Sequence, residues 1–108
     1  MLDIPVIRWG KEYESLEKAD VVHFNTGEPI ASVSQANGGL VSRDMRKADL
    51  ARKKLREFSC DDLIERVAKA ADLFETETLA IGNGQQSPDE FVHHQSASTG
   101  LPTWELGA

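Results

Sequence analysis

One stretch of the chain carries glycines at a spacing that dinucleotide-binding turns use. In LAIGNGQQSPDEF, Gly82 and Gly84 follow a short apolar run and precede a helix start signal. In such a turn the glycines let the backbone approach a pyrophosphate at a helix N-terminus. Here Ser87 takes the third glycine position, and no second strand follows to complete the unit. An ordinary loop and a capped helix are therefore favoured over a phosphate site.

Two adjacent histidines, His93 and His94, are candidates for metal binding. On a helix, neighbouring side chains point about 100° apart, so these two cannot bind one ion, whose ligands stand three or four residues apart. Asp89 or Glu90 has such a spacing from one of the histidines. A solvated helix face is the favoured interpretation, and we predict no metal site.

Cys60, the single cysteine, is a candidate nucleophile. We expect it in the first turn of a helix, where the helix dipole favours a thiolate. Asp61 and Asp62 oppose that charge, and no histidine lies near it in sequence to act as a base. A buried or incidental thiol is therefore favoured. We predict no catalytic, cofactor-binding or metal-binding residue in this chain.

Seven of the twelve basic residues are concentrated in the stretch 43–56, although the whole chain has a net charge of −6. These seven are Arg43, Arg46, Lys47, Arg52, Lys53, Lys54 and Arg56. A helix with basic residues opposite an apolar stripe can bind an acidic partner or a membrane surface. Because Asp44, Asp49 and Glu57 interrupt the cluster, the charged outer face of a packed helix is the favoured interpretation.

The length and composition allow one domain with a modest core. The chain has 108 residues, of which 40% are hydrophobic and 6% aromatic, so the core must rely on aliphatic side chains. The negative net charge argues against nucleic acid and acidic membranes as partners. One cysteine excludes an internal disulfide, the N-terminus lacks signal-peptide features, and no apolar run is long enough to cross a bilayer. We therefore expect a cytoplasmic protein.

The N-terminal part of the chain is expected to form strands. The β-branched and aromatic residues over 4–9, with Pro5 near the start and Gly10 after the end, predict a short edge strand. A charged linker follows over 11–20. The β-prone runs VVHF and IASVS, separated by the turn residues NTGEP, predict an antiparallel hairpin.

Two helices are expected next. Asn37 is a suitable cap for a first helix that runs to Phe58, with apolar residues at spacings of three and four. Ser59 and Asp62 have the spacing of a capping box and predict the start of a second helix, which ends near residue 78. The two helices form a short-linked pair, each with one apolar stripe.

The last part of the chain contains a further helix start signal. LAIGNGQQ is expected to be an extended or looped connection. Ser87 as cap, Pro88 at the first helical position and Glu90 three residues after the cap predict a third helix. That helix ends near Ser98, before TGLP.

The expected architecture is a single, partial α+β domain. It comprises a strand and hairpin region over 1–36, a helix pair over 37–78, and a loop, short helix and tail over 79–108. The order of elements contains no βαβ unit, so we expect no parallel sheet within the chain. The helices then have apolar stripes but little sheet to cover.

Four motifs in order resemble one enzyme superfamily. They are TGEPIASVSQAN, the helix ending ADLARKKLREF, the helix CDDLIERVAKAADLF and the closing SASTGLP. This order is similar to the N-terminal part of the aldehyde dehydrogenase superfamily, and most similar to a bacterial branch. In that family a T-G-E turn joins two early strands, and a later helix carries an arginine that Arg66 matches here. The lysine before the proline of the closing turn is Leu101 in this chain.

The resemblance implies an N-terminal fragment of an NAD(P)-dependent aldehyde dehydrogenase. The chain would correspond to the start of the α/β, Rossmann-type cofactor domain and would serve as scaffold only, since it stops after TWELGA. In the family the catalytic cysteine, the general-base glutamate and the oxyanion-binding asparagine all lie downstream. The chain itself is then inactive and binds no cofactor, and its partner is the remainder of the enzyme. The alternative is a stand-alone helical module that self-associates.

Overall fold

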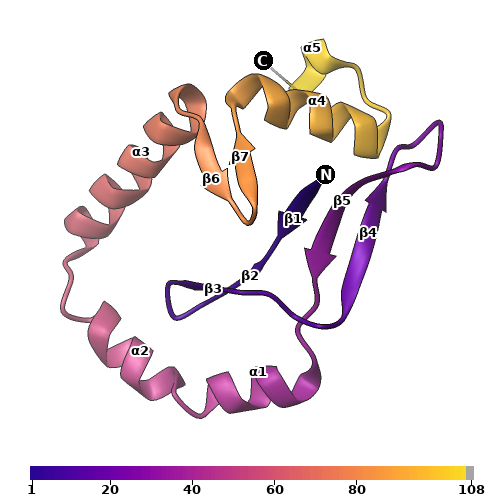
Figure 1. The fold of residues 1–108 in the computed structure, drawn as a ribbon. Helices are drawn as coiled ribbons and strands as arrows, with labels where there is room; N and C mark the ends of the chain where they lie inside the picture. The colour runs from indigo at the N-terminus through magenta and orange to yellow at the C-terminus, as the bar shows by residue number, and fades with distance from the viewer. Residues whose placement is uncertain (107–108) are drawn as a thin grey trace.

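The computed structural model describes residues 1–106 and has an α+β fold (Figure 1). The strands are β1 (Leu2–Ile4), β2 (Val6–Arg8), β3 (Lys11–Tyr13), β4 (Lys18–Val22), β5 (Pro29–Ser34), β6 (Leu79–Ile81) and β7 (Gly84–Gln86). The helices are α1 (Gly38–Met45), α2 (Ala48–Leu55), α3 (Cys60–Thr76), α4 (Pro88–Thr99) and α5 (Thr103–Leu106). The expected α+β class is confirmed, with more and shorter elements than the sequence indicated.

The largest sheet has three strands in the order β1-β5-β4. The hairpin of β4 and β5 is antiparallel, as predicted, with an irregularity between Val21 and Val22. β1 pairs in parallel with β5, Leu2 opposite Ala31. The expectation that the chain has no parallel sheet is therefore corrected, because this mixed sheet contains one parallel pair. The connection from β1 to β5 runs through other strands rather than a helix, so it lacks the βαβ pattern by which parallel pairs are recognised.

The single strand expected over 4–9 is two strands that pair with different partners. Pro5 separates β1 from β2, because it has no N–H to donate to a ladder. β2 forms an antiparallel hairpin with β3, which lies in the expected charged linker. The turn between them is Trp9-Gly10, and both residues have positive φ, 53° and 75°. Two consecutive positive φ values suit the tight turn of a two-residue hairpin loop.

The first predicted helix is interrupted. Asn37 caps α1 as expected, its side chain accepting from the backbone N–H of Leu40 at 2.8 Å. The chain leaves the helical conformation at Lys47 (φ −98°, ψ 4°), whose N–H donates to Asp44 O at 3.0 Å. This bond spans three residues instead of four and tightens the end of α1 before α2 begins. Neither proline nor glycine marks the break, so the sequence predicted one helix where there are two.

The other helix start signals behave as predicted. The Ser59 hydroxyl accepts from the backbone N–H of Asp62 at 3.1 Å and caps α3. Ser87 and Glu90 form a complete capping box at the start of α4. Gly100 ends α4 in the left-handed conformation with φ 78°, as is common after a helix.

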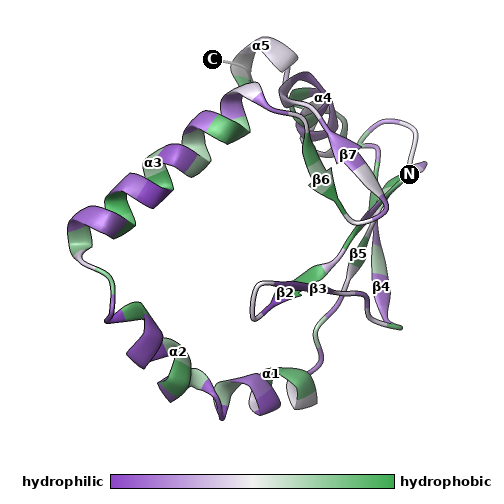
Figure 2. Cartoon of the chain, turned by 60° about the vertical axis from the view of Figure 1, so that its left-hand side comes forward, coloured by the Kyte–Doolittle hydropathy of each residue, from purple (hydrophilic) through white to green (hydrophobic). Residues whose placement is uncertain are grey.

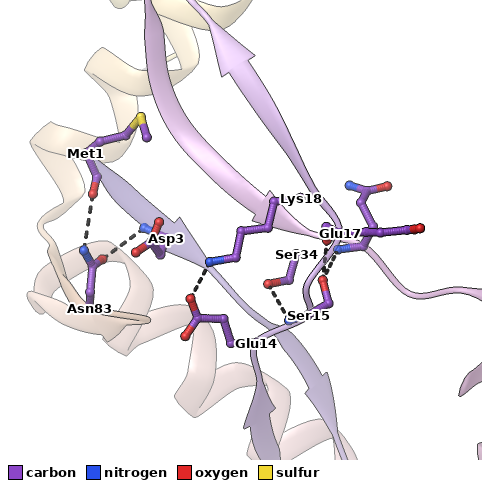
Figure 3. A network of polar contacts seen from close by, with 9 residues as sticks. Met1, Asp3, Glu14, Ser15, Glu17, Lys18, Ser34 and Asn83 are labelled. Atoms are coloured by element: carbon purple, nitrogen blue, oxygen red, sulfur yellow. Dashed lines mark hydrogen bonds and ion pairs between the residues drawn. The ribbon is translucent and has the colours of Figure 1, made fainter.

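The connection expected over LAIGNGQQ is a β-hairpin formed by β6 and β7. Its turn is held against β1 by a small polar network (Figure 3). The Asn83 side chain accepts from the backbone N–H of Asp3 at 3.0 Å and donates to Met1 O at 3.4 Å. Gly82 allows this approach, because a Cβ at its position would lie 1.7 Å from Asp3 O. Residues 80 positions apart are thereby joined.

Little apolar surface is buried in this fold. Among the described residues, the buried ones are Ala31, at 7% exposure, and the serines Ser15, Ser32 and Ser34. The radius of gyration is 16.8 Å, whereas a compact domain of this length has about 13 Å. The accessible surface is 8394 Å², and a compact monomer of 11.9 kDa exposes about 5,900 Å². The chain therefore exposes about 2,400 Å² more than a compact monomer of its size.

Helices α1, α2 and α3 follow one another around an arc that begins after β5 of the three-stranded sheet and ends at the separate β6–β7 hairpin (Figures 1 and 2). The link between α2 and α3 is short, as expected, but the two helices lie end to end around the arc. Their apolar stripes are left in solvent: Val41, Met45, Leu50, Leu55, Ile64 and Val67 are all exposed. The interpretation of the stretch 43–56 as the charged outer face of a packed helix is therefore wrong, because the apolar faces of α1 and α2 are exposed.

Candidate interaction surface

An ion pair between the N-terminal hairpin and α1 holds the start of the arc in place. Arg8 donates to Asp44 through two nitrogens, Nε to Oδ2 at 2.7 Å and Nη2 to Oδ1 at 2.6 Å. Trp9 Nε1 donates to the same Oδ1 at 3.3 Å. Both charged side chains are about one-quarter exposed. A two-point contact of this kind fixes direction as well as distance.

The pair changes the ionisation of Asp44. The hydrogen bonds from Arg8, more than the Trp9 bond or the nearby positive charges, lower the pKa of the Asp44 carboxyl from 3.8 to about 2. Partial burial opposes this change but does not outweigh it. The guanidinium of Arg8 also lies 5.1 Å from the centre of the Tyr13 ring, which is within the range of a cation–π contact. β2, β3 and α1 are thus joined at one point.

Trp9, placed by this contact, forms an apolar groove with the exposed face of α2. The groove has a volume of about 460 Å³ and is lined by Trp9, Lys47, Leu50, Ala51, Lys54, Leu55 and Phe58. The residues on the helix recur at spacings of three and four, so they lie on one face. Leu50 is 65% exposed and Leu55 56%. We call this surface the α2 groove.

Two aromatic contacts connect α3 to its neighbours. The guanidinium of Arg66 lies 4.6 Å from the centre of the Phe58 ring, just beyond the end of α2. At the other end, the ring of Phe74 meets that of Phe91 in α4 edge to face, with centres 4.9 Å apart. Between these contacts the stripe of α3 is open, with Ile64 67% and Val67 70% exposed.

The charges on α2 and α3 have opposite signs. α2 carries the basic residues Arg52, Lys53 and Lys54, and Lys47 comes just before it; Lys47 and Lys54 line the groove itself. α3 carries a row of acidic residues along one edge of its apolar stripe, at helical spacings of three, four and seven. This row is Asp61, Glu65, Asp72 and Glu75. Each helix therefore combines an exposed apolar face with a net excess of one charge, since α2 contains one acidic residue, Asp49, and α3 contains two basic ones, Arg66 and Lys69.

The glycine-rich stretch does not form a phosphate-binding turn. Gly82 lies in the turn of the β6–β7 hairpin and Gly84 begins β7, so both belong to an antiparallel pair. The N–H of Glu90 at the start of α4 is satisfied by Ser87. The interpretation of a capped helix is confirmed. The expected loop is a hairpin, and its two-residue Gly-Asn turn was the signal in the sequence.

The histidines and the cysteine lie apart from the groove. His93 Nδ1 is 2.8 Å from Asp89 O within α4, and His94 Nδ1 is 2.7 Å from Gln86 Oε1 of β7. His93 is exposed as expected, whereas His94 is half-buried by its contact with β7. Within residues 1–106, no three metal-binding side chains come together. Cys60 lies in the first turn of α3, as expected, and is exposed, so of the two favoured interpretations, a buried or an incidental thiol, the buried thiol is wrong.

The sequence did not indicate Arg8, Trp9 or Asp44 as residues that act together. Arg8 and Trp9 end a short strand and Asp44 lies within a helix, more than 30 positions later. No local pattern signals such a pairing. The apolar residues of α2 did show the helical spacing of a buried face, and the expectation that the helices have little sheet to cover agrees with the exposure of this face.

Comparison of the chain with protein-family models, with curated proteins and with solved structures finds no match. In the described part of the chain, no helix combines the length and the apolar character needed to cross a bilayer.

Proposed function

We propose that this chain is a scaffold segment that performs no chemistry of its own. Its role is to bind another protein surface, so that the apolar faces of both are buried. The observation that carries the proposal is the near absence of a buried apolar core beside three exposed apolar helix faces. Burial of apolar area supplies the main free energy of folding, about 25 cal/mol for each Å². A chain that buries so little gains its stability largely through a partner.

The first candidate for that partner is the remainder of an NAD(P)-dependent enzyme of the aldehyde dehydrogenase type. The ordered motifs support it, and two of them meet in space. Phe24, just before the TGE turn, donates its N–H to Ala97 O at 2.8 Å, and its ring adjoins Gly100 of TGLP. On this proposal the chain is the beginning of the Rossmann-type cofactor domain. The whole enzyme, in the cytoplasm, would oxidise an aldehyde with residues from outside this chain.

The second candidate is another copy of the same chain. Opposite charges on two exposed apolar helices, α2 and α3, favour it. Both candidates bind the same exposed apolar helix faces. They differ in the partner, which is the remainder of an enzyme in the first and a second copy of the chain in the other.

The test of the scaffold role is whether stability depends on association. We expect sedimentation equilibrium of the isolated chain to show self-association, and we expect its urea midpoint to rise with protein concentration. For a dimer, a tenfold rise in concentration adds about 1.4 kcal/mol to the apparent free energy of unfolding. A monomer that unfolds cooperatively at a concentration-independent midpoint would contradict the proposal.

The DNA that follows the last codon separates the two candidates. A downstream frame that encodes a segment with a catalytic cysteine, a general-base glutamate and a nucleotide-binding sheet supports the enzyme. If such a frame exists, the chain and its product should co-purify when expressed together. If they do not, self-association is the better explanation of the exposed faces.

A further inference from the structure

We propose that the α2 groove of one chain binds helix α3 of a second copy, and that two such contacts form a symmetric dimer. This inference rests on the proposed scaffold function and names the partner of its exposed faces. It concerns the chain by itself, without any further polypeptide.

The groove has the shape and composition of a helix-binding site. It is open to solvent, about 460 Å³ in volume, and lined by Trp9, the apolar face of α2 and Phe58. Amphipathic helices bind in such grooves by placing residues three and four positions apart against them. Trp9 at one edge is of a type that contributes most to binding energy at protein interfaces, and Phe58 at the other is of a type enriched there.

Helix α3 has the matching face. Ile64, Val67, Ala71 and Phe74 recur at spacings of three and four, and Ile64 and Val67 are more exposed than Phe74. α3 has 17 residues and α2 has 8, so α3 is long enough to span the whole groove. Phe74 already contacts Phe91, which leaves the part of α3 before Phe74 as the part that binds.

Charge explains why the occupant is α3 rather than another apolar segment. Lys47 and Lys54 line the groove seven residues apart, and Glu65 and Asp72 in the acidic row of α3 are also seven apart. Seven residues are nearly two helical turns and span about 10.5 Å along an axis. The two lysines can therefore face the two carboxylates at the same time. In the single chain Lys54 forms an ion pair with Glu57 at 3.0 Å, and both side chains are well exposed. An exposed pair of this kind contributes little stability, so Lys54 can pair with a carboxylate of α3 instead.

Symmetry doubles this contact. In a dimer with a two-fold axis, the α2 groove of each chain receives α3 of the other. The excess exposed surface of about 2,400 Å² per chain is as large as an obligate dimer requires. Two identical helix contacts, each with an apolar centre and charged edges, provide a way to bury it.

Charge exchange tests the pairing directly. The double variant Lys47→Glu/Lys54→Glu places like charges in both contacts of its dimer, and so does Glu65→Lys/Asp72→Lys. We expect each to raise the dissociation constant of the dimer at least about tenfold. In an equal mixture of the two variants both contacts are complementary again, so the dissociation constant of the mixed dimer should return to within about threefold of the wild-type value.

A matched control distinguishes the effect of charge in the groove from the effect of the net charge of the chain. Arg52→Glu/Lys53→Glu makes the same change in net charge on the other side of α2, outside the groove, and should leave dimerisation unchanged. The two groove variants have net charges of about −10 and −2, from −6 with two units for each replaced residue. Both remain negative, so general attraction cannot explain association in the mixture. Circular dichroism of each variant checks that the helices are retained.

The outcomes distinguish this inference from the scaffold proposal. Loss in each variant with recovery in the mixture supports the α2–α3 pairing. Wild-type association that is unaffected by either variant, or not recovered in the mixture, overturns the pairing and leaves the scaffold role intact. A wild-type chain that stays monomeric at about 100 µM, a concentration that populates even dimers of micromolar affinity, and that unfolds cooperatively overturns both.

Discussion

Arg8 in β2 and Asp44 in α1, 36 positions apart in the sequence, form a two-point ion pair that ties the N-terminal hairpin to the first helix. The same carboxylate accepts from Trp9, which in turn forms one wall of the α2 groove. The ion pair thus sets the position of the surface on which the proposed function depends.

The lowered pKa of Asp44 predicts acid sensitivity. The carboxyl takes up a proton less readily in the folded state, with a pKa of about 2, than in the unfolded state, where its pKa is about 3.9. Its contribution to stability is therefore complete above about pH 5 and is lost progressively as the pH falls through the unfolded and then the folded pKa. We expect the urea midpoint of the wild-type chain to decrease as the pH is lowered through this window. The decrease should be smaller in Asp44→Asn, which has no carboxyl to protonate at this position. Asp49→Asn, outside the Arg8 contact, is the control and should behave as wild type.

The geometry of the ion pair predicts that lysine cannot replace Arg8. A lysine keeps the charge but cannot make both hydrogen bonds to Asp44. In a Trp104→Phe background, where Trp9 is the remaining tryptophan, Arg8→Lys should shift the fluorescence emission to longer wavelength as Trp9 leaves α2. The Arg43→Lys variant should not change the emission. An unchanged spectrum in Arg8→Lys would show that Trp9 is held without the two-point contact.

Gly82 is predicted to tolerate no side chain. Gly82→Ala places a Cβ 1.7 Å from Asp3 O and at a φ of 53°. Gly27→Ala is a matched control, with a φ of 73° and no atom within 4 Å of the added Cβ. Both changes carry the left-handed strain of about 1 kcal/mol, and only Gly82→Ala adds a clash of about 1–3 kcal/mol. Urea unfolding should rank Gly82→Ala well below Gly27→Ala, and equal losses would contradict the docking of the hairpin on β1.

The capping box of α4 predicts a defined loss. Ser87→Ala removes the acceptor for the Glu90 N–H and should reduce stability by about 1 kcal/mol. Ser87→Thr keeps a hydroxyl acceptor in place and should therefore retain most of the stability that the cap provides. Amide exchange over the first turn of α4, measured by NMR, reports the change locally. Equal protection in the alanine and threonine variants would mean that the cap contributes nothing measurable.

The scaffold role predicts that the isolated chain binds no nicotinamide cofactor. Gly82 and Gly84 are in a hairpin, and no other part of the described chain resembles a dinucleotide turn. Calorimetry with NAD and NADP should therefore show no saturable binding tighter than about millimolar. Saturable micromolar binding of either would contradict the proposal.

Features that depend on a few neighbouring residues were predicted well. Asn37, Ser59 and Ser87 cap helices at the expected positions, and Gly100 ends α4. The predicted hairpin turns at NTGE, although its first strand ends at Val22 rather than Phe24 and Pro29 already belongs to β5. Each of these depends on a hydrogen bond or a backbone conformation set within about four residues, so the necessary information lies in one short stretch.

Features that depend on distant partners were decided only by the tertiary structure. The parallel pairing of β1 with β5, the Arg8–Asp44 contact and the docking of Asn83 on β1 join residues about 30 to 80 positions apart, and no local pattern names the partner. The sequence by itself determined that α2 and α3 each have an apolar face and an excess of one charge. Only the tertiary structure decided that both faces stay open, because periodicity shows that a face favours burial but not whether its own chain folds back to cover it.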